Sequence, residues 1–342
     1  MLNFCTLFDS NYLTRGLAMY HSLEKVCPKF HLYIFAFDEE CLHYFTQEAA
    51  AYPHCTVISL KEFEDEALLA VKPQRSIAEY CWTCTSSTIL YCIQQFQLAH
   101  CTYIDADMIF YSNPQVLIDE MGSKDVLISE HRYTPTYDQT DYSGVYCVQF
   151  MCFKNTANGL HILNWWRERC LEWCYARLEN GKFGDQKYLD DWTTRFMNVH
   201  VMQHRGGGVA PWNVQQYTIS SGPTLKYQGI LTPLVFFHFH GVKFYTNKQV
   251  SYCGPLYELS EAVKDNLYQP YVQQLLQQQI YLHQQGFFNN SGALKKAPSA
   301  FSVWLQFIKS SLQQIKKGKA NPLQIKWFNF NRHNHFNPTD KF

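Results

Sequence analysis

Two aspartates at the end of an apolar segment are the residues of this chain best placed to do chemistry. Asp105 and Asp107 stand in Cys-Thr-Tyr-Ile-Asp-Ala-Asp-Met-Ile-Phe-Tyr, which predicts a buried strand, with a turn at Asn113-Pro114 beyond it. On an extended chain, side chains two residues apart point to the same side. Two such carboxylates suit Mg²⁺ or Mn²⁺ together with waters and phosphate oxygens. Because open α/β sheets bind ligands at the carboxyl ends of strands, we expect the site here.

The segments around this pair alternate between predicted strands and predicted helices. This alternation predicts an α/β fold, Rossmann-like, with a mixed, mainly parallel sheet flanked by helices. We expect a catalytic domain over residues 1–250 and a helical C-terminal extension with a basic and aromatic tail over residues 251–342. Apolar runs predict strands at residues 2–8, 31–37, 55–60, 125–129, 145–153 and 231–239, and helical patterns cover residues 76–96, 159–178, 271–283 and 301–316.

The charge of the chain is unevenly distributed. Its 342 residues carry no net charge, but residues 295–342 hold nine lysines and arginines against Asp340, which leaves −8 for the remainder. Lys316, Lys317 and Lys326 stand among aromatic residues, which predicts peripheral contact with a membrane surface. A solvated basic end is the alternative. Nucleic acid is not expected as a partner, because the body is acidic and shows no known binding motif.

The start of the chain shows no charged leader followed by a hydrophobic run, and no apolar stretch approaches the roughly 18 residues of a spanning helix. We therefore expect a cytoplasmic location, peripheral at the inner face of the membrane if the tail binds lipid. Thirteen cysteines in such a chain predict reduced thiols that pack as small apolar side chains. A zinc site built from Cys81, Cys84, Cys170 and Cys174 is the alternative, although these contexts lack the turn glycines of a zinc knuckle.

Two polar segments follow predicted elements where a ligand could bind. Residues 8–12, Phe-Asp-Ser-Asn-Tyr, end the first predicted strand, so their polar side chains can read the edge of a base while an aromatic ring stacks on it. A plain turn and helix cap is the alternative. In residues 183–189, Phe-Gly-Asp-Gln-Lys-Tyr-Leu, Asp185 and Gln186 can place a carboxylate and an amide near a sugar ring. A capping aspartate is the alternative there.

A glycine run lies in residues 205–213, Arg-Gly-Gly-Gly-Val-Ala-Pro-Trp-Asn. It predicts a mobile loop that could close over a ligand. Trp212 could stack on a sugar face, and Asn213 could bond sugar hydroxyls. A phosphate-binding P-loop is not expected, because no Lys-Ser/Thr follows the glycines.

Two histidines alternate at the end of the last predicted strand. His238 and His240 share a strand face in Phe-Phe-His-Phe-His-Gly-Val-Lys, so either could complete a metal site. Lys243, after the turn, could neutralise a diphosphate. The alternative is that both histidines belong to the core.

Taken in order, these segments resemble the GT-A-fold glycosyltransferases, nearest to the family 8-like nucleotide-diphospho-sugar transferases. The resemblance implies an enzyme that moves a sugar from a nucleotide-diphospho-sugar, foremost a UDP-sugar, to a hydroxyl of a glycan, lipid or protein. The matching motifs span roughly residues 1–245: Phe-Asp-Ser-Asn-Tyr at 8–12, Tyr-Ile-Asp-Ala-Asp at 103–107, Gly-Asp-Gln-Lys-Tyr-Leu at 184–189, Ala-Pro-Trp-Asn at 210–213 and His-Phe-His-Gly-Val-Lys at 238–243.

The same resemblance implies roles for individual residues. Asp105, Asp107 and His238 would bind Mn²⁺ (or Mg²⁺), with His240 the close rival of His238. Asp185, together with Gln186, would be the catalytic pair beside the anomeric carbon. Asp9 and Asn11 would read the uracil, Lys243 would hold phosphate, and Trp212 and Asn213 would line the donor–acceptor cleft. The full set expected to hold cofactor or donor is Thr6, Phe8, Asp9, Asn11, Tyr12, Asp105, Ala106, Asp107, Trp212, Asn213, Gly241 and Lys243.

The chain departs from the family pattern in two places. An Asn-x-Gly common on the central strand reads Cys147-Val148-Gln149, and an Arg on the helix before the aspartates has no counterpart in residues 80–85. A catalytically inactive nucleotide-sugar-binding relative is therefore the main alternative, and a sugar-nucleotide nucleotidyltransferase is a further one. Retention and inversion both stay open. In an inverting enzyme Asp185 or Glu130 would act as base.

Overall fold

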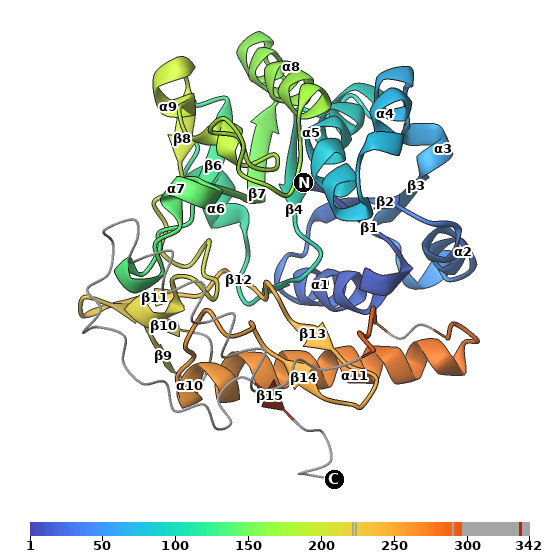
Figure 1. The fold of residues 1–342 in the computed structure, drawn as a ribbon, viewed down its shortest axis with the longest axis vertical. Coiled ribbons are helices and arrows are strands. Elements are labelled where there is room, and N and C mark those ends of the chain that lie inside the picture. Colours follow the sequence, from blue (N-terminus) through green and yellow to red (C-terminus); the bar gives the residue numbers. More distant parts are fainter. Residues whose placement is uncertain (221, 223, 289–290, 296–334, 337–342) are drawn as a thin grey trace.

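A seven-stranded sheet forms the centre of the protein in the computed structural model (Figure 1). The structure describes residues 1–220, 222, 224–288, 291–295 and 335–336. The strand order is β3-β2-β1-β4-β7-β6-β8. The strands are β1 (Leu2–Phe8), β2 (Phe30–Ala36), β3 (Cys55–Ser59), β4 (His100–Ile104), β6 (Val126–Glu130), β7 (Tyr146–Lys154) and β8 (Val199–Val201).

The sheet is mixed and mainly parallel, which confirms the predicted fold class. β3, β2, β1 and β4 run parallel to one another, and β6 runs parallel to β8. β7 is antiparallel to both of its neighbours, β4 and β6. All residues of β7 except the last are buried, as expected for a strand covered on both faces.

Strand β1 shows why both faces of the sheet are covered. Leu2, Phe4 and Phe8 point to the face that packs against helix α1, whereas Cys5 and Leu7 point to the opposite face, against α5. Burying each large apolar side chain contributes roughly 1.5–3 kcal/mol. The alternation therefore fixes a helix layer on each side of the sheet.

The helices begin at recognisable caps. In α5, the Ser76 hydroxyl accepts from the Glu79 N–H at 3.3 Å, and the Glu79 carboxylate accepts from the Ser76 N–H at 2.9 Å. α8 ends at Glu172, earlier than predicted, because the chain becomes extended at Trp173. The helices are α1 (Leu13–Val26), α2 (Glu39–Gln47), α3 (Leu60–Phe63), α4 (Glu66–Val71), α5 (Ile77–Gln95), α6 (Gln115–Asp119), α7 (Thr140–Ser143), α8 (Ala157–Glu172), α9 (Trp192–Arg195), α10 (Glu261–Val263) and α11 (Gln269–Gln284).

The predicted strand at residues 231–239 is wrong as a single element. Pro233 ends the first half, because proline has no N–H to continue a ladder, and Val235 donates instead to the carbonyl of Gly206 at 2.8 Å. The two halves join different small sheets. The remaining strands are β5 (Met108–Phe110), β9 (Thr218–Ser220), β10 (Thr224–Tyr227), β11 (Ile230–Pro233), β12 (Phe236–His238), β13 (Lys243–Phe244), β14 (Val250–Ser251) and β15 (His335–Phe336).

The segment after residue 250 packs against the body of the protein. Helix α11 lies along α1, and both run below the sheet in the view of Figure 1. A domain division at residue 250 stays a prediction. The helix predicted at residues 301–316 and the aromatic lysine-rich tail lie outside the described residues. Within the described part of the chain, no helix is long and apolar enough to cross a membrane.

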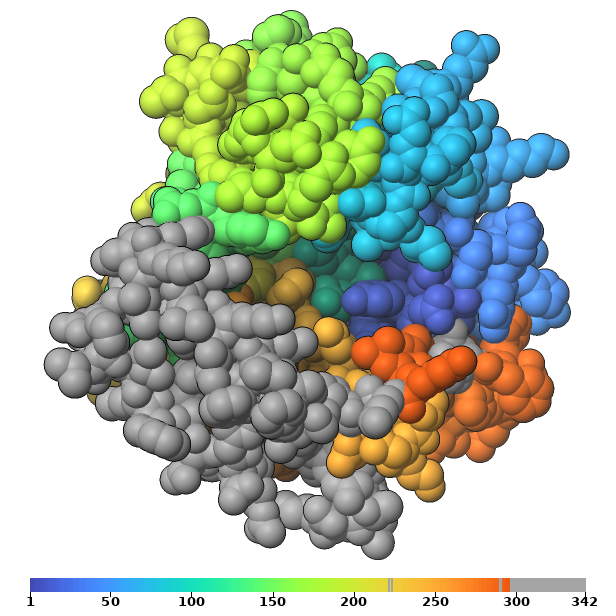
Figure 2. All heavy atoms as spheres, viewed as in Figure 1, coloured from blue at the N-terminus to red at the C-terminus, as the bar shows by residue number. Residues whose placement is uncertain are grey.

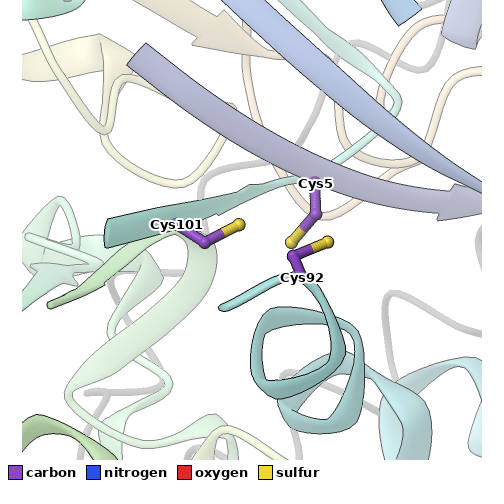
Figure 3. A group of neighbouring side chains, drawn as sticks. All are labelled: Cys5, Cys92 and Cys101. Carbon is purple, nitrogen blue, oxygen red and sulfur yellow. The ribbon is translucent and has the colours of Figure 1, made fainter. Parts of the chain in front are cut away.

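All thirteen cysteines are unpaired, as expected for reduced thiols. Figure 3 shows three of them, Cys5 of β1, Cys92 of α5 and Cys101 of β4, whose sulfur atoms lie within 4.8 Å of one another in the layer between sheet and helix. All three are fully buried, so they pack as small core side chains. Among the described residues, the four cysteines of the alternative zinc site form no comparable group.

Candidate active site

The pairing of β5 with β12 sets the geometry of the site. β5 begins directly after Asp107, and its register pairs Met108 with His238. The N–H of Phe239 donates to the carbonyl of Asp107 at 2.9 Å, which extends the pairing past the strand ends. Asp105 and Asp107 lie in a turn between β4 and β5, not on the extended segment that the sequence predicts. The antiparallel pairing nevertheless brings the late histidine to both carboxylates.

Asp105, Asp107 and His238 form a compact group of oxygen and nitrogen ligands. Nε2 of His238 lies 3.0 Å from Oδ1 of Asp107 and 3.6 Å from Oδ2 of Asp105. One ligand atom from each residue lies within 4.8 Å of the other two. His238 and Asp107 are buried, while Asp105 is partly exposed. Two carboxylates and an imidazole fit a divalent cation such as Mn²⁺, because the charge of the group and its donor types match that ion.

A second hydrogen bond fixes which nitrogen of His238 faces the carboxylates. Nδ1 donates to Oε1 of Gln149, which is fully buried on β7, at 2.9 Å. An amide oxygen only accepts, so Nδ1 carries the hydrogen, and Nε2 is the atom offered to a metal. Gln149 stands in the stretch where the sequence departs from the Asn-x-Gly pattern. The departure therefore supplies the partner of the histidine.

Charge and burial compete strongly within the group. Burial opposes the positive charge of His238, but the carboxylates of Asp107 and Asp105 outweigh it and hold its pKa well above the usual range. Burial likewise opposes the negative charge of Asp107, yet the charge and hydrogen bond of His238 lower the pKa of Asp107 to about 2. Burial raises the pKa of Asp105 to about 6. A divalent cation would replace the proton held between these groups.

Asp185 lies next to this group of three residues, and only part of the hydrogen-bonding capacity of its carboxylate is used. Its side chain is 4% exposed, and its Oδ2 has no hydrogen-bond partner among the described residues. Burial, then the negative charge of Asp105, raises the pKa of Asp185 to about 7. The neighbouring Gln186 is held by a hydrogen bond from Nε2 to the carbonyl of Ser143 at 2.7 Å. Asp185 therefore offers a buried oxygen that can take or give a proton near neutral pH.

The segment after β1 lies near the same aspartates. Asp9 and Asn11 are joined by a hydrogen bond of 3.0 Å on an exposed turn, and Tyr12 is 41% exposed beside them. Partial burial, then the charge of Asp107, raises the pKa of the Tyr12 hydroxyl to about 12, so this ring lies in the field of the aspartates. These side chains are available to a ligand that reaches the carboxylates.

Arg15 is a residue that the motifs did not reveal. Its buried guanidinium donates to the carbonyl of Asn11 at 3.3 Å and to that of Val242 at 3.1 Å, and it lies 4.4 Å from the ring of Tyr12. Arg15 thus ties the turn after β1 to the turn that carries Lys243. An arginine on the otherwise apolar side of α1 is the one sequence signal that could have indicated it.

The turn after β12 carries three of the predicted residues, of which two are exposed. Gly241 has φ +83°, a conformation that favours glycine, and it reverses the chain between His240 and Lys243. His240 is exposed, unlike His238, and makes no part of the three-residue group. Lys243 is exposed at the start of β13. Of the two histidines, His238 is therefore the one that lies with the two aspartates, and the exposed side chain of Lys243 is accessible to a ligand.

Other predicted residues lie beneath the site and do not line it. Thr6 and Phe8 are in the core, and the ring of Phe8 fills the space in front of Gly16. Asn213 is fully buried and donates to the carbonyls of His131 and Gly208 at 2.7 and 2.8 Å. A side chain engaged in this way cannot bond sugar hydroxyls, so Asn213 supports the loop instead.

Trp212 and Ala106 are also buried. The indole of Trp212 meets the ring of His238 edge-on at 5.5 Å and that of His131 at 5.2 Å. It therefore supports the imidazole from below and offers no open face for stacking on a sugar. Ala106 lies between the two aspartates in the turn, where a small side chain leaves their carboxylates unobstructed.

The predicted mobile glycine loop is close-packed. Gly206, Gly207 and Gly208 are all buried. A Cβ at Gly206 would lie 2.0 Å from the carbonyl of Pro233, and one at Gly208 would lie 2.7 Å from the guanidinium of Arg132. The glycines are therefore needed for close approach of neighbouring groups, and the expectation of a mobile closing loop is corrected.

Figure 2 shows a hollow in the middle of the displayed face. Teal atoms, the colour of residues near 105, lie at its floor, with the indigo start of the chain on one side and yellow-green atoms from residues near 180 above. The hollow is therefore where these three stretches of the chain meet at the surface of the displayed face.

No family model matches the chain. Two uncharacterized proteins of Bacillus subtilis (strain 168) are similar to it in sequence. YfnD is 28% identical over 274 residues, which are 79% of this chain and 87% of YfnD. YfnF is 29% identical over 287 residues, 81% of this chain and 91% of YfnF.

Among solved structures, the chain is similar to several glycosyltransferases, the class that its motifs resemble. The galactosyltransferase LgtC, solved with donor and acceptor sugar analogs, has a TM-score of 0.48 at 13% identity, covering 81% of this chain and 96% of LgtC. GlyE of Streptococcus pneumoniae TIGR4 has a TM-score of 0.48 at 12% identity, covering 87% and 66%. Mouse xyloside xylosyltransferase 1 has a TM-score of 0.43 at 12% identity, covering 69% and 97%.

Proposed function

We propose that the protein is a metal-dependent glycosyltransferase that moves a sugar from a nucleotide-diphospho-sugar, a UDP-sugar in the first instance, to a hydroxyl of a glycan, lipid or protein. The observation that carries this proposal is the group of Asp105, Asp107 and His238, assembled by the register of β5 and β12. The motif resemblance supports it, because the same residues are those that the family pattern assigns to the metal.

The residue types suit a diphosphate more than other anions. Asp105, Asp107 and His238 would hold Mn²⁺ or Mg²⁺, which when bound would stabilise the charge that develops on a departing diphosphate. Lys243, exposed after the turn, would add a positive charge on the same side. Tyr12 and Asn11, tied to that turn through Arg15, would contact the nucleoside. The protein would then promote the reaction chiefly by positioning the donor and by stabilising the developing charge electrostatically.

Asp185 is the residue that we assign to the reacting centre. Its unpartnered, buried Oδ2 can accept a hydrogen bond from a sugar or acceptor hydroxyl. With a pKa of about 7, it can be neutral or charged at physiological pH. Gln186 would align the same sugar from its place beside Ser143. Whether the reaction retains or inverts the anomeric configuration depends on which side of the sugar faces Asp185.

Nucleotide-induced stabilisation tests this function. UDP, GDP, CDP and ADP would each be added with Mn²⁺ or with EDTA, and the unfolding temperature measured. We expect UDP with Mn²⁺ to raise the Tm, and Asp107→Asn to remove the rise. Asp191→Asn, which changes an exposed carboxylate paired with Arg195, is the matched control and should behave as wild type. The proposal fails if none of the nucleoside diphosphates raises the Tm in a metal-dependent way.

If UDP raises the Tm but the protein releases no UDP from any UDP-sugar, the result would favour a catalytically inactive protein that only binds nucleotide sugars. Release of pyrophosphate from a nucleoside triphosphate and a sugar phosphate would point to a nucleotidyltransferase. The two assays therefore separate the proposed activity from both alternatives.

A further inference from the structure

A cavity of about 460 Å³ is lined mainly by the end of β6 and the loop that follows it. Its polar lining comes from Glu130, Arg132, Tyr133, Asp138, Arg205 and Gln216. A volume of this size is in the range of small-molecule sites. None of these residues is used by the metal group or by the donor contacts proposed above.

The cavity adjoins the site through two sets of contacts. His131, next to Arg132 in sequence, meets the edge of Trp212, and Trp212 meets His238. On the other side, Lys187 donates from Nζ to the carbonyl of Thr140, which lines the cavity, at 3.1 Å. Lys187 follows Gln186 directly, so the cavity borders the residues placed at the reacting centre.

The two arginines of the cavity lack acidic partners. Among the described residues, neither Arg132 nor Arg205 has a carboxylate oxygen within 4.0 Å. Within the described part of the chain, the guanidinium of Arg132 donates only to the carbonyls of His204 and Gly207, and that of Arg205 lies 4.7 Å from the ring of Tyr227. The two guanidinium groups repel each other, and the carboxylates of Glu130 and Asp138 line the same cavity. An anion that bound between the two arginines would remove their mutual repulsion.

The backbone conformation of Arg132 indicates that the surrounding structure holds this residue in place. Its φ is +49°, in the left-handed region that residues with a bulky side chain rarely adopt. Gly208 leaves room for its guanidinium, since a Cβ there would lie 2.7 Å away. Strained residues of this kind cluster at binding sites, where the surrounding structure maintains them.

We infer that this cavity binds the anionic group of the acceptor, either a sugar carboxylate or a phosphate. Arg205 and Arg132 would form charge-assisted hydrogen bonds with it. Glu130 and the free acceptor atom of Gln216, whose Nε2 is held by the carbonyl of Arg132 at 2.6 Å, would take hydroxyl hydrogens of the same ligand. At the rim of the cavity, Oδ1 of Asp138 accepts a hydrogen bond from the N–H of Thr140 at 2.8 Å. This inference names the acceptor class for the proposed transferase and so rests on that function.

Binding of matched sugars to the whole protein tests the inference. Glucuronate, glucose 6-phosphate and glucose would be titrated by calorimetry with UDP and Mn²⁺ at saturation, so that the donor site is filled. We expect one of the two anionic sugars to bind at least tenfold more tightly than glucose, and the one preferred identifies carboxylate or phosphate as the group. Arg205→Gln should abolish the preference. Arg195→Gln, which removes an exposed arginine paired with Asp191, is the control and should keep it.

Equal affinity for glucose and both anionic sugars would overturn the inference, as would an unchanged preference in Arg205→Gln. Metal-dependent binding of UDP, measured in the same samples, reports on the proposed function separately. UDP binding without an anion preference would leave the transferase and remove the acceptor assignment. An anion preference without UDP binding would keep the cavity as an anion site and remove the transferase.

Discussion

Nδ1 of His238 lies 2.9 Å from Oε1 of Gln149, and both side chains are buried. This contact orients the imidazole so that Nε2 points to Asp107. Gln149→Leu should therefore free the ring and weaken Mn²⁺ binding about 10- to 100-fold, as loss of a ligand's outer partner usually does. Mn²⁺ titration followed by electron paramagnetic resonance measures this. Gln284→Leu, at an exposed position of α11, is the control, and equal affinity in both variants would show that Gln149 does not orient the ligand.

Metal binding should weaken as the pH falls. In the metal-free protein the pKa of Asp105 is about 6 and that of His238 is raised well above its usual value, so a cation must displace protons from both. Each displaced proton changes the affinity about tenfold per pH unit. Titrations at pH 5.5, 6.5 and 7.5 should give increasing Mn²⁺ affinity. Calorimetry in buffers with different enthalpies of ionisation should show that protons are released when the metal binds. A constant affinity over this range would contradict the assignment of these ligands.

The buried Asp185 should make stability depend on pH. Its pKa in the folded protein, about 7, lies above the ordinary value of 3.8, so between these values the folded state binds a proton that the unfolded state does not. This contribution to stability is fully present below about pH 4 and is lost as the pH rises through 7. Asp185→Asn should consequently gain stability relative to wild type by up to about 1.4 kcal/mol per pH unit over that window.

Urea unfolding of wild type and Asp185→Asn at pH 5 and pH 8 makes the comparison. Asp191→Asn, at an exposed position, controls for removal of a carboxylate. A difference between Asp185→Asn and wild type that is the same at both pH values would show that Asp185 titrates normally.

Gly208 should be far less replaceable than another glycine of similar backbone conformation. Gly208 has φ +71° and a Cβ there would meet Arg132, whereas Gly222 has φ +79° and a Cβ there would have no atom of the described residues within 4 Å. Gly222→Ala should cost about 1 kcal/mol from the backbone alone. Gly208→Ala should cost about 1–3 kcal/mol more, because the guanidinium must also move. Equal unfolding free energies for the two variants would mean that the packing around residues 206–208 is loose.

Local pattern was enough to predict much of the fold. The apolar run at residues 2–8 matches β1 residue for residue, and the helical pattern at residues 76–96 matches α5 to within one residue at each end. Residue types alone leave His238 and His240 as rival metal ligands, and only the motif resemblance favours His238, because the register that joins His238 to Asp107 is a long-range pairing without a local signal. Such pairings depend on how two distant segments pack.

The remaining site residues show where local reasoning fails. Trp212 and Asn213 have the side chains of a sugar-binding loop, yet both are buried beneath the metal group. The glycine run before them has the composition of a mobile loop, but it is packed because other backbone and side-chain groups approach it closely. Burial of this kind is set by tertiary packing, and residue type alone does not report it.

Release of free UDP from a panel of UDP-sugars, with Mn²⁺ or with EDTA, is the most direct test of the central claim. Wild type should release UDP from at least one donor in a Mn²⁺-dependent way, and Asp107→Asn should lose at least 99% of that rate, since the main carboxylate of the metal group is gone. Undiminished release in EDTA or in Asp107→Asn would contradict a function for the group of Asp105, Asp107 and His238. No release from any UDP-sugar would contradict the transferase activity itself.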